Sequence, residues 1–461
     1  MKPSLPQGTR DFSADIIRKR QYILTTIEKV FGLYGFEPLE TPAIENLETL
    51  MGKYGEEGDK LIFKILNNGL DNPAKRGAVQ KGLEAILEGK NDKSITERAL
   101  RYDLTIPFAR YLAMNFGQLT MPFKRYQMQN VWRADRPQKG RYREFVQCDA
   151  DIAGTNSLLS DAELALIYLQ VFEKLQIGVE IKLNSRKILA ALAEVCGGAS
   201  HLTAITVAID KLDKVGIHKV KEELSASQLT AAQIDTIENY LQISGSNAEK
   251  LIKISGIIGS VSAGREGIAE LSSLLQCLKE AAGSAVDDTI TIDFTLARGL
   301  NYYTGSIFEV KAKQVVMGSI GGGGRYDDLT GLFGLPSIPG VGISFGVDRI
   351  YDVMNELRLF PGELLQSTVA IFLNLGEKEA AVAFKEMQKL RTNGISCELY
   401  YENAKMEKQF RYATKKNIPH AVIIGSTEVA EKTCIIKDLK RGQQQTIPLD
   451  QLLPFFAGAR D

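Results

Sequence analysis

Two long extended segments, joined by a short polar turn, constrain the fold of this chain more than any other part of its sequence. Residues 122–134 and 143–153 both have the character of strands, and only a turn connects them. Strands joined so closely pair in an antiparallel fashion. The sequence therefore predicts a long antiparallel hairpin, and with it a sheet to which the hairpin belongs.

The part of the hairpin from Lys124 to Arg143 is also the most charge-biased part of the chain, with a single acid, Asp135, among its charged residues. A guanidinium pairs with two phosphate oxygens at once, so such a hairpin can hold a polyphosphate. A solvated basic turn is the alternative that charge alone leaves open. Net charge is zero, so any contact with nucleic acid must come from a local basic patch. The basic residues are Lys124, Arg125, Arg133, Arg136, Lys139, Arg141 and Arg143.

Composition excludes several classes of protein. The five cysteines are scattered and form no CxxC pair, which argues against a disulfide framework and a zinc knuckle and fits a reducing cytosol. The three histidines lie away from the motifs described below, so we expect no histidine-ligated metal. Neither a signal core nor a membrane-spanning run is present. We expect a cytoplasmic protein that does not associate with membranes.

Changes in amino-acid composition and residue pattern along the chain predict its domains. Residues 196–285 are rich in Ala, Ser, Leu, Lys and Glu and poor in aromatics, which indicates a helical insertion with its own small core. Beyond residue 367, strands alternate with helices, as in a compact α/β domain. The expected divisions are a catalytic domain in two parts (1–195 and 286–358), the insertion (196–285), a linker (359–367) and the C-terminal domain (368–461).

Three further features suggest a ligand site. The run from Gly321 to Gly324 allows close backbone approach to a ligand, although tight packing between strands explains it equally well. It continues into Arg-Tyr-Asp and so is no lysine-bearing phosphate loop. Asp103, Asp149 and Asp151 flank apolar stretches, where a carboxylate needs a cationic or hydrogen-bonding partner. Structural salt bridges would satisfy them as well, and Tyr302 and Tyr303 taken alone suggest sheet packing.

Taken in chain order, these segments resemble the class II aminoacyl-tRNA synthetases over nearly the whole chain. The three class II motifs are similar to residues 35–42, 123–151 and 340–349. The resemblance implies an α+β fold, with a catalytic domain built on an antiparallel sheet flanked by helices. It also implies a helical insertion, a C-terminal α/β anticodon-binding domain and a homodimer whose interface includes the first motif.

Narrower matches point to the histidyl-tRNA synthetase family. Residues 100–105 (LRYDLT) and 147–151 (QCDAD) resemble its amino-acid pocket, and 298–303 (RGLNYY) and 321–327 (GGGGRYD) resemble its two histidine-specific motifs. The implied reaction is ATP-dependent ligation of L-histidine to its cognate tRNA through a histidyl-adenylate, releasing AMP and diphosphate. Mg²⁺ accompanies ATP, and the resemblance implies neither a protein-held metal nor a tightly bound prosthetic group.

The resemblance also implies a role for individual side chains. Arg298 is expected to act as a catalytic cation against the α-phosphate of ATP, together with Arg133. Arg136 and Gln138, in the turn of the hairpin, are expected to contact tRNA. The implied ATP site is Arg133, Arg141, Glu144, Phe145 and Arg349. The implied histidine site is Asp103, Leu104, Thr105, Arg133, Gln147, Asp151, Arg298, Tyr302 and Tyr303.

The chain departs from the family pattern at three positions. Asn301 stands where the family usually has Asp, which weakens any charge partner for Arg298. Asp103 and Asp151 are shorter than the glutamates of many bacterial relatives and follow the eukaryotic and archaeal variant, whereas the Pro137-Gln138-Lys139 turn is bacterial in form. This mixture leaves the source of the protein open.

Two other functions remain as alternatives. One is a synthetase-like regulatory subunit of ATP phosphoribosyltransferase, which binds histidine without charging tRNA. Such paralogues typically lack the anticodon-binding domain and degrade the motif that this chain keeps at 298–303. The other is a class II synthetase for proline, threonine or glycine, which would share the three class motifs but not the segments at Arg298 and at residues 147–151.

Overall fold

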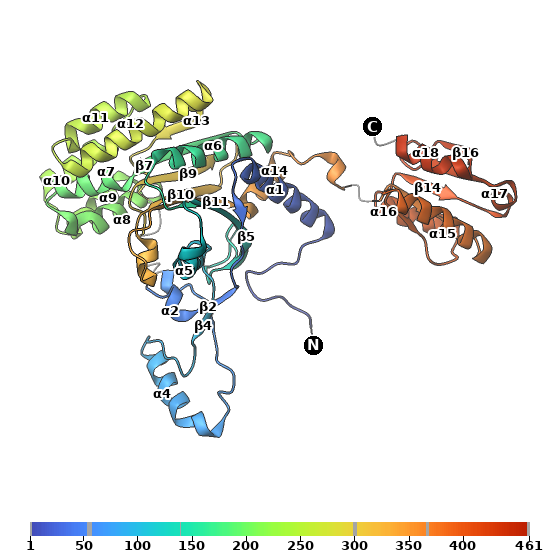
Figure 1. Cartoon of the computed structure of the whole chain (residues 1–461), viewed down its shortest axis with the longest axis horizontal. Helices are drawn as coiled ribbons and strands as arrows, with labels where there is room; N and C mark the ends of the chain where they lie inside the picture. Colours follow the sequence, from blue (N-terminus) through green and yellow to red (C-terminus); the bar gives the residue numbers. More distant parts are fainter. Residues whose placement is uncertain (1, 53–57, 139, 298–301, 366–367, 459–461) are drawn as a thin grey trace. The chain divides into compact units, whose positions relative to one another are not determined.

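The computed structural model describes residues 2–52, 58–138, 140–297, 302–365 and 368–458. The chain forms two compact units, Met1–Leu359 and Phe360–Asp461 (Figure 1). Each unit has a sheet of its own, with helices packed against it.

An eight-stranded sheet forms the centre of the first unit. Every neighbouring pair in it is antiparallel except the pair at each edge, β1 with β5 and β7 with β8. The predicted hairpin is confirmed, because β5 and β6 pair along their whole length, from Phe123 opposite Ala153 to Trp132 opposite Glu144. In spatial order the strands are β1 (Glu37–Pro38), β5 (Phe123–Trp132), β6 (Glu144–Ala153), β11 (Gly340–Gly346), β10 (Gly321–Tyr326), β9 (Ser306–Ala312), β7 (Val179–Ser185) and β8 (Ile290–Ile292).

Helices α1 (Ala14–Leu33), α6 (Leu158–Lys174) and α14 (Val347–Glu356) cover one face of this sheet. Apolar residues of α1 recur three and four positions apart and are buried, as the pattern predicts for an amphipathic helix. The ring of Phe345 on β11 lies 5.9 Å from that of Phe31 and 4.8 Å from that of Tyr168. Full burial of each such ring contributes roughly 1.5–3 kcal/mol, so this aromatic cluster anchors the helices to the sheet.

The glycine run itself forms the first four residues of a strand, β10. Three of the glycines are required by packing. A Cβ on Gly321 would lie 2.7 Å from the ring of Tyr168, and one on Gly323 would lie 2.1 Å from the carbonyl oxygen of Gly342. A Cβ on Gly322, on the opposite face, would meet only one atom, at 3.4 Å. A Cβ on Gly324, which shares that face, would lie 2.7 Å from the carbonyl oxygen of Ser306, so of these four glycines only Gly322 has open space beside it.

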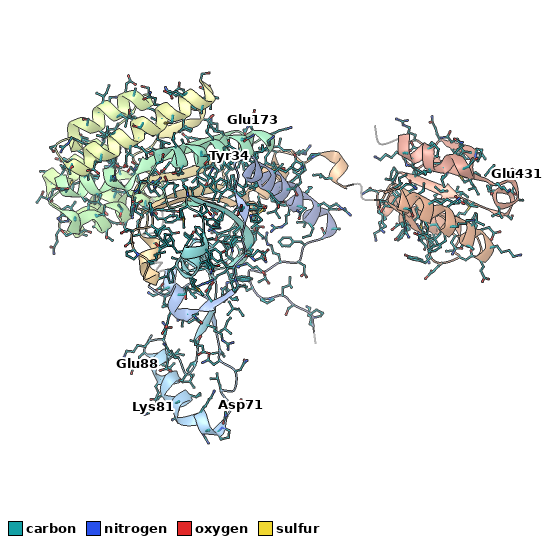
Figure 2. The ribbon with its side chains drawn as sticks, viewed as in Figure 1. Tyr34, Asp71, Lys81, Glu88, Glu173 and Glu431 are labelled. Atoms are coloured by element: carbon teal, nitrogen blue, oxygen red, sulfur yellow. The ribbon has the colours of Figure 1, made fainter. Side chains whose placement is uncertain are left out.

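A segment between two short strands projects from the first unit and was not expected from the sequence. Strands β2 (Ile44–Asn46), β4 (Arg98–Leu100) and β3 (Lys64–Ile65) form a three-stranded sheet beside α2 (Leu47–Leu50). Between β3 and β4 the chain extends to form α4 (Arg76–Leu87), well away from the large sheet in Figure 1. Asp71, Lys81 and Glu88 mark this segment in Figure 2.

The remaining part of the first unit is helical. Helix α5 (Thr105–Asn115) has Pro107 in its first turn, where a proline is tolerated because the backbone N–H there has no partner within the helix. The predicted helices within residues 196–285 are present, and the longest of them, α12, packs against α6 and α7. The helices within this range are α8 (Leu202–Asp210), α9 (Leu212–Ala226), α10 (Ala231–Leu241), α11 (Asn247–Ile258) and α12 (Ser262–Ala282). Helix α7 (Arg186–Val195) precedes the range, and α13 (Ala285–Thr289) begins at its last residue.

The second unit confirms the predicted alternation of strands and helices. Strands β13 (Cys397–Leu399), β12 (Ala370–Phe372) and β14 (His420–Ile423) are parallel, as their helical crossovers require. Strands β15 (Thr433–Asp438) and β16 (Gln444–Pro448) extend the sheet in antiparallel fashion, and β16 was not predicted. The helices are α15 (Glu377–Thr392), α16 (Met406–Lys415), α17 (Ser426–Glu431) and α18 (Leu452–Ala457).

Within the described ranges, no single helix is long and apolar enough to span a bilayer. One pair bent by 118°, Arg186–Val195 with Ala199–Asp210, passes that test only when its two helices are taken together.

The packing of β10 predicts that Gly323→Ala destabilises the first unit. The added methyl group would collide with the backbone of β11, which cannot move without breaking strand pairing. We expect a loss of at least about 2 kcal/mol in the free energy of unfolding by urea. Gly77→Ala on α4 is the control, because no atom lies within 4 Å of its added Cβ. Equal stability of the two variants would contradict the packing described for β10.

Candidate active site

The face of the large sheet opposite helices α1, α6 and α14 carries polar side chains. Side chains alternate along a strand, so residues 125 and 127 of β5 share a face with residues 149 and 151 of β6. The adjoining strands contribute Ser344 and several glycines, which leave space above the sheet. In register, one row runs Arg125, Asp151, Gly342, Gly324, and the next runs Gln127, Asp149, Ser344, Gly322.

Two cavities open on this face and share the side chains of Arg133, Gln147 and Ser344. Their linings contain most of the residues predicted for histidine and for ATP. The first cavity, called here the acidic pocket, includes Asp103, Thr105, Asp149, Asp151, Tyr302, Tyr303 and Tyr326. The second, called the arginine pocket, includes Asp135, Gly140, Arg141, Phe145, Ser319, Asp348 and Arg349.

Arg133 occupies the junction of the two pockets. Its Nε donates to the backbone oxygen of Tyr102 at 3.1 Å, and one terminal nitrogen donates to Oε1 of Gln147 at 3.4 Å. The guanidinium also lies over the rings of Tyr102 and Phe145, 4.4 and 5.2 Å from their centroids. These contacts fix a cation whose remaining donors can serve a ligand in either pocket.

Buried charges dominate the acidic pocket. Oδ2 of Asp151 lies 2.8 Å from a guanidinium nitrogen of Arg125, which is fully buried, and Oδ1 accepts a 2.7 Å hydrogen bond from the Tyr326 hydroxyl. Oδ1 of Asp103 accepts from the backbone N–H of Ile106, at the start of α5. Asp149 is 3% exposed, and its Oδ1 has no hydrogen-bond partner among the described residues.

Burial raises the pKa of these acids. For Asp149, burial and the neighbouring Asp151 carboxylate outweigh the attraction of Arg125 and raise the pKa to about 7. The pKa of Asp151 is also raised by burial, although Arg125 and the Tyr326 hydroxyl oppose this rise. One buried arginine therefore serves two carboxylates, and the pocket favours ligands that bring positive charge or N–H donors.

Three arginines give the arginine pocket the opposite character. Burial, together with the nearby charges of Arg141 and Arg133, lowers the pKa of Arg349. Arg349 donates from Nε to the backbone oxygen of Gly140 at 3.0 Å and from a terminal nitrogen to that of Ser319 at 2.7 Å. Asp135 pairs with Arg141 at 3.1 Å. This surplus of cations suits a polyanionic ligand.

Some predicted residues lie outside these two linings. The backbone oxygen of Leu104 accepts from Arg125, and the Leu104 side chain is fully buried. Glu144 accepts a hydrogen bond from Asn130 at 3.0 Å. Arg136 and Gln138 are exposed in the hairpin turn, where Gln138 forms a bridge with Arg141. Arg298 and Asn301 fall outside the described residues.

Two basic residues of the hairpin have structural partners and are not free for phosphate. Lys124 pairs with Glu163 at 2.7 Å, and Arg125 is the buried partner of Asp151. The alternation of side chains along a strand could have predicted that Arg125 shares a face with the acids of β6. Only the strand register shows that it faces Asp151. Ser344 was missed as a pocket residue because serine in a strand carries no distinctive signal.

Comparison with known proteins shows which family the chain is similar to. A family model described as Histidyl-tRNA synthetase matches residues 79–350, and one described as Anticodon binding domain matches residues 369–458. Curated relatives named Histidine--tRNA ligase are 48% identical in Phocaeicola vulgatus and 49% identical in Bacteroides fragilis, over 452 residues and 98% of each chain.

The chain belongs to the histidyl-tRNA synthetase family. The solved structure of histidyl-tRNA synthetase from Nostoc sp. PCC 7120 is 31% identical, with a TM-score of 0.81 over 100% of both chains. The predicted α+β class II fold is therefore confirmed. A structure from Bacillus halodurans, titled as an ATP phosphoribosyltransferase regulatory subunit/histidyl-tRNA synthetase, is 19% identical with a TM-score of 0.71 and shares the fold.

The raised pKa of Asp149 predicts that Asp149→Asn stabilises this histidyl-tRNA synthetase family member at high pH. Between pH 4 and 7 the folded wild type keeps a proton that the unfolded chain has lost, so its stability falls as pH rises. The asparagine variant lacks this loss, which amounts to at most about 4 kcal/mol above pH 7. Urea unfolding at pH 4.5, 6 and 8 should show an advantage for the variant that grows with pH. An advantage independent of pH would contradict the buried ionisation.

Proposed function

We propose that this protein ligates L-histidine to its cognate tRNA in two steps. A carboxylate oxygen of histidine attacks the α-phosphorus of ATP, which forms histidyl-adenylate and releases diphosphate. A terminal ribose hydroxyl of the tRNA then attacks the acyl carbon and releases AMP. The observation that carries the proposal is the meeting of an acidic pocket and an arginine pocket at Arg133.

The two pockets match the two substrates of the first step, ATP and histidine. The cationic residues Arg133, Arg141 and Arg349 suit the phosphates of ATP, and the ring of Phe145 offers a stacking surface for adenine. Asp103, Thr105 and Gln147 offer acceptors for the α-ammonium group of histidine. With the amino acid and nucleotide bound on either side of Arg133, the reacting carboxylate and α-phosphate meet at its guanidinium.

Stabilisation of charge supplies the chemistry in this proposal. The transition state gathers negative charge on the α-phosphate, and fixed guanidinium groups stabilise it without reorganisation. Mg²⁺ enters as part of the nucleotide substrate, with the β- and γ-phosphate oxygens as its natural ligands. No side chain needs to act as a base, since the attacking carboxylate is already ionised.

Polar complementarity gives the specificity for histidine. An imidazole ring presents one N–H donor and one acceptor, and the acidic pocket is lined by carboxylates and tyrosine hydroxyls. A site built from such groups rejects apolar analogues by about 10⁴–10⁵, because its own polar atoms would otherwise lose their partners. Correction by a separate editing domain is then unnecessary.

The proposal assigns tRNA to two parts of the chain. The second unit binds the anticodon, as the family model matched to residues 369–458 suggests. Arg136 and Gln138, exposed at the tip of the β5–β6 hairpin, contact the acceptor end. We further propose that the enzyme acts as a cytoplasmic homodimer, with residues 35–42 at the interface between the subunits.

The reaction is tested by histidine-dependent exchange of labelled diphosphate into ATP, followed by charging of purified histidine tRNA. We expect exchange with L-histidine alone among the amino acids. Exchange driven by proline, threonine or glycine would identify a different synthetase. Histidine binding without exchange would instead support the regulatory alternative.

Arg298 provides a second test of the mechanism, based on its sequence motif. A cation that contacts the α-phosphate mainly in the transition state contributes to kcat rather than to binding. We therefore expect Arg298→Ala to lower kcat for diphosphate exchange by about 10²-fold or more, with little change in KM for histidine. Arg298→Lys, which keeps the charge but not the planar fork, should recover part of the loss. An unchanged kcat in Arg298→Ala would remove this residue from the mechanism.

A further inference from the structure

Residues 2–13 precede helix α1 and form neither a helix nor a strand, and the reaction described above does not use them. Part of this N-terminal segment nevertheless lies against the hairpin turn, just before β6 begins. The backbone N–H of Arg143 donates to the carbonyl oxygen of Gly8 at 3.0 Å, and a terminal nitrogen of its side chain donates to that of Gln7 at 3.4 Å. Gly8 has a φ of +84°, and a Cβ there would lie 2.8 Å from the Arg143 side chain. The N-terminal segment is therefore packed closely on the turn.

Arg10 connects this segment to two residues of the arginine pocket. Its guanidinium lies 3.2 Å from the ring centroid of Tyr142, and a terminal nitrogen donates to Oδ1 of Asp348 at 2.6 Å. Tyr142 and Asp348 line the arginine pocket, and Arg10 is not part of that lining. An arginine that stacks on an aromatic ring and pairs with a carboxylate is held in one orientation. Arg10 thus joins the hairpin, which carries Tyr142, to the first turn of α14, which carries Asp348.

The two residues that Arg10 contacts are next in sequence to two of the cations proposed for ATP. Arg141 precedes Tyr142, and Arg349 follows Asp348. The side chain of Arg141 is half exposed, so its position depends on the part of the hairpin that carries it. A contact that holds Tyr142 against Asp348 therefore also sets how far apart Arg141 and Arg349 lie.

We propose that Arg10 is a positioning residue for ATP. By holding the ring of Tyr142 and the carboxylate of Asp348, it fixes the hairpin turn against α14 in the arrangement that receives the phosphates. Reacting groups that are held in place before the ligand binds lose less freedom on binding. This inference rests on the proposed function, because it takes ATP as the ligand of the arginine pocket.

Asp348 does not depend on Arg10 alone for a partner. The guanidinium of Arg20, on α1, is buried and also pairs with Oδ1 of Asp348. Both arginines lie near the ring of Phe12, Arg20 at 4.4 Å and Arg10 at 4.8 Å from its centroid. Removal of Arg10 therefore leaves the buried carboxylate paired, so we expect the substitution to change the pocket while the fold persists.

Steady-state diphosphate exchange with the full-length protein tests the proposal. Arg10→Ala should raise KM for ATP by about tenfold and leave KM for histidine within about twofold of wild type, because neither partner of Arg10 lines the acidic pocket. Arg10→Lys keeps the charge opposite Asp348 but lacks the planar group that stacks on Tyr142, so it should recover part of the loss.

Arg18→Ala is the matched control. The side chains of Arg10 and Arg18 are 26% and 32% exposed, and both substitutions remove one positive charge near the N-terminus. Arg18 pairs with Asp15 on α1 and does not line the arginine pocket. KM for ATP should therefore be unchanged in this variant. An unchanged KM for ATP in Arg10→Ala overturns the proposal, as does an equal rise for histidine and ATP or an equal rise in Arg18→Ala.

Hydrogen exchange at backbone amides of the wild-type protein tests the same idea without a variant. Coupling between two sites is reciprocal, so if the N-terminal segment stabilises the ATP site, then ATP stabilises the segment. ATP with Mg²⁺, in the absence of histidine, should slow amide exchange in residues 2–12, and L-histidine alone should not. Unchanged amide exchange in this segment with ATP overturns the proposal. If ATP slows it but the wild type shows no histidine-dependent diphosphate exchange, the proposed function fails instead, so the two failures are distinguishable.

Discussion

Arg125 lies in the middle of the polar face of the sheet with its guanidinium fully buried, facing Asp151 across the β5–β6 pair. Charges removed from water are tolerated only when they are paired, and loss of one partner strands the other at a cost of several kcal/mol. The orientation of Asp151 and Tyr326 and the ionisation of Asp149 all depend on this cation. The acidic pocket is thus organised around an ion pair that belongs to the sheet itself.

The sequence was most informative where a local pattern determines the structure. Periodicity and chain connectivity predicted the β5–β6 hairpin and the α/β alternation after residue 367. The sequence was least informative where tertiary contacts determine the local structure. The glycines of β10 are in a strand because Tyr168 and β11 pack against them, and glycine alone has no preference for strands. The segment that carries α4 lacks a strong signal because few of its side chains are buried.

The candidate site shows the same division. Motif resemblance located Asp103, Thr105, Arg133, Gln147 and Asp151, and the structure places these side chains around one pocket. The sequence alone could not show that Asp151 pairs with Arg125 and accepts a hydrogen bond from Tyr326, because these contacts depend on strand register and on residues distant in the chain. The role of Arg298 still depends on its sequence motif.

At Gly322, strand β10 contributes backbone and no side chain to the lining of the acidic pocket. A mutation replaces a side chain and leaves the peptide group in place. Single substitutions can therefore hardly adjust a part of the site that is made of backbone atoms. A larger residue at Gly322 would occupy ligand space, and one at Gly323 would push apart the strands. Any drift in amino-acid preference, natural or engineered, has to come from the opposite wall, where β5 and β6 present residues that can be exchanged one at a time.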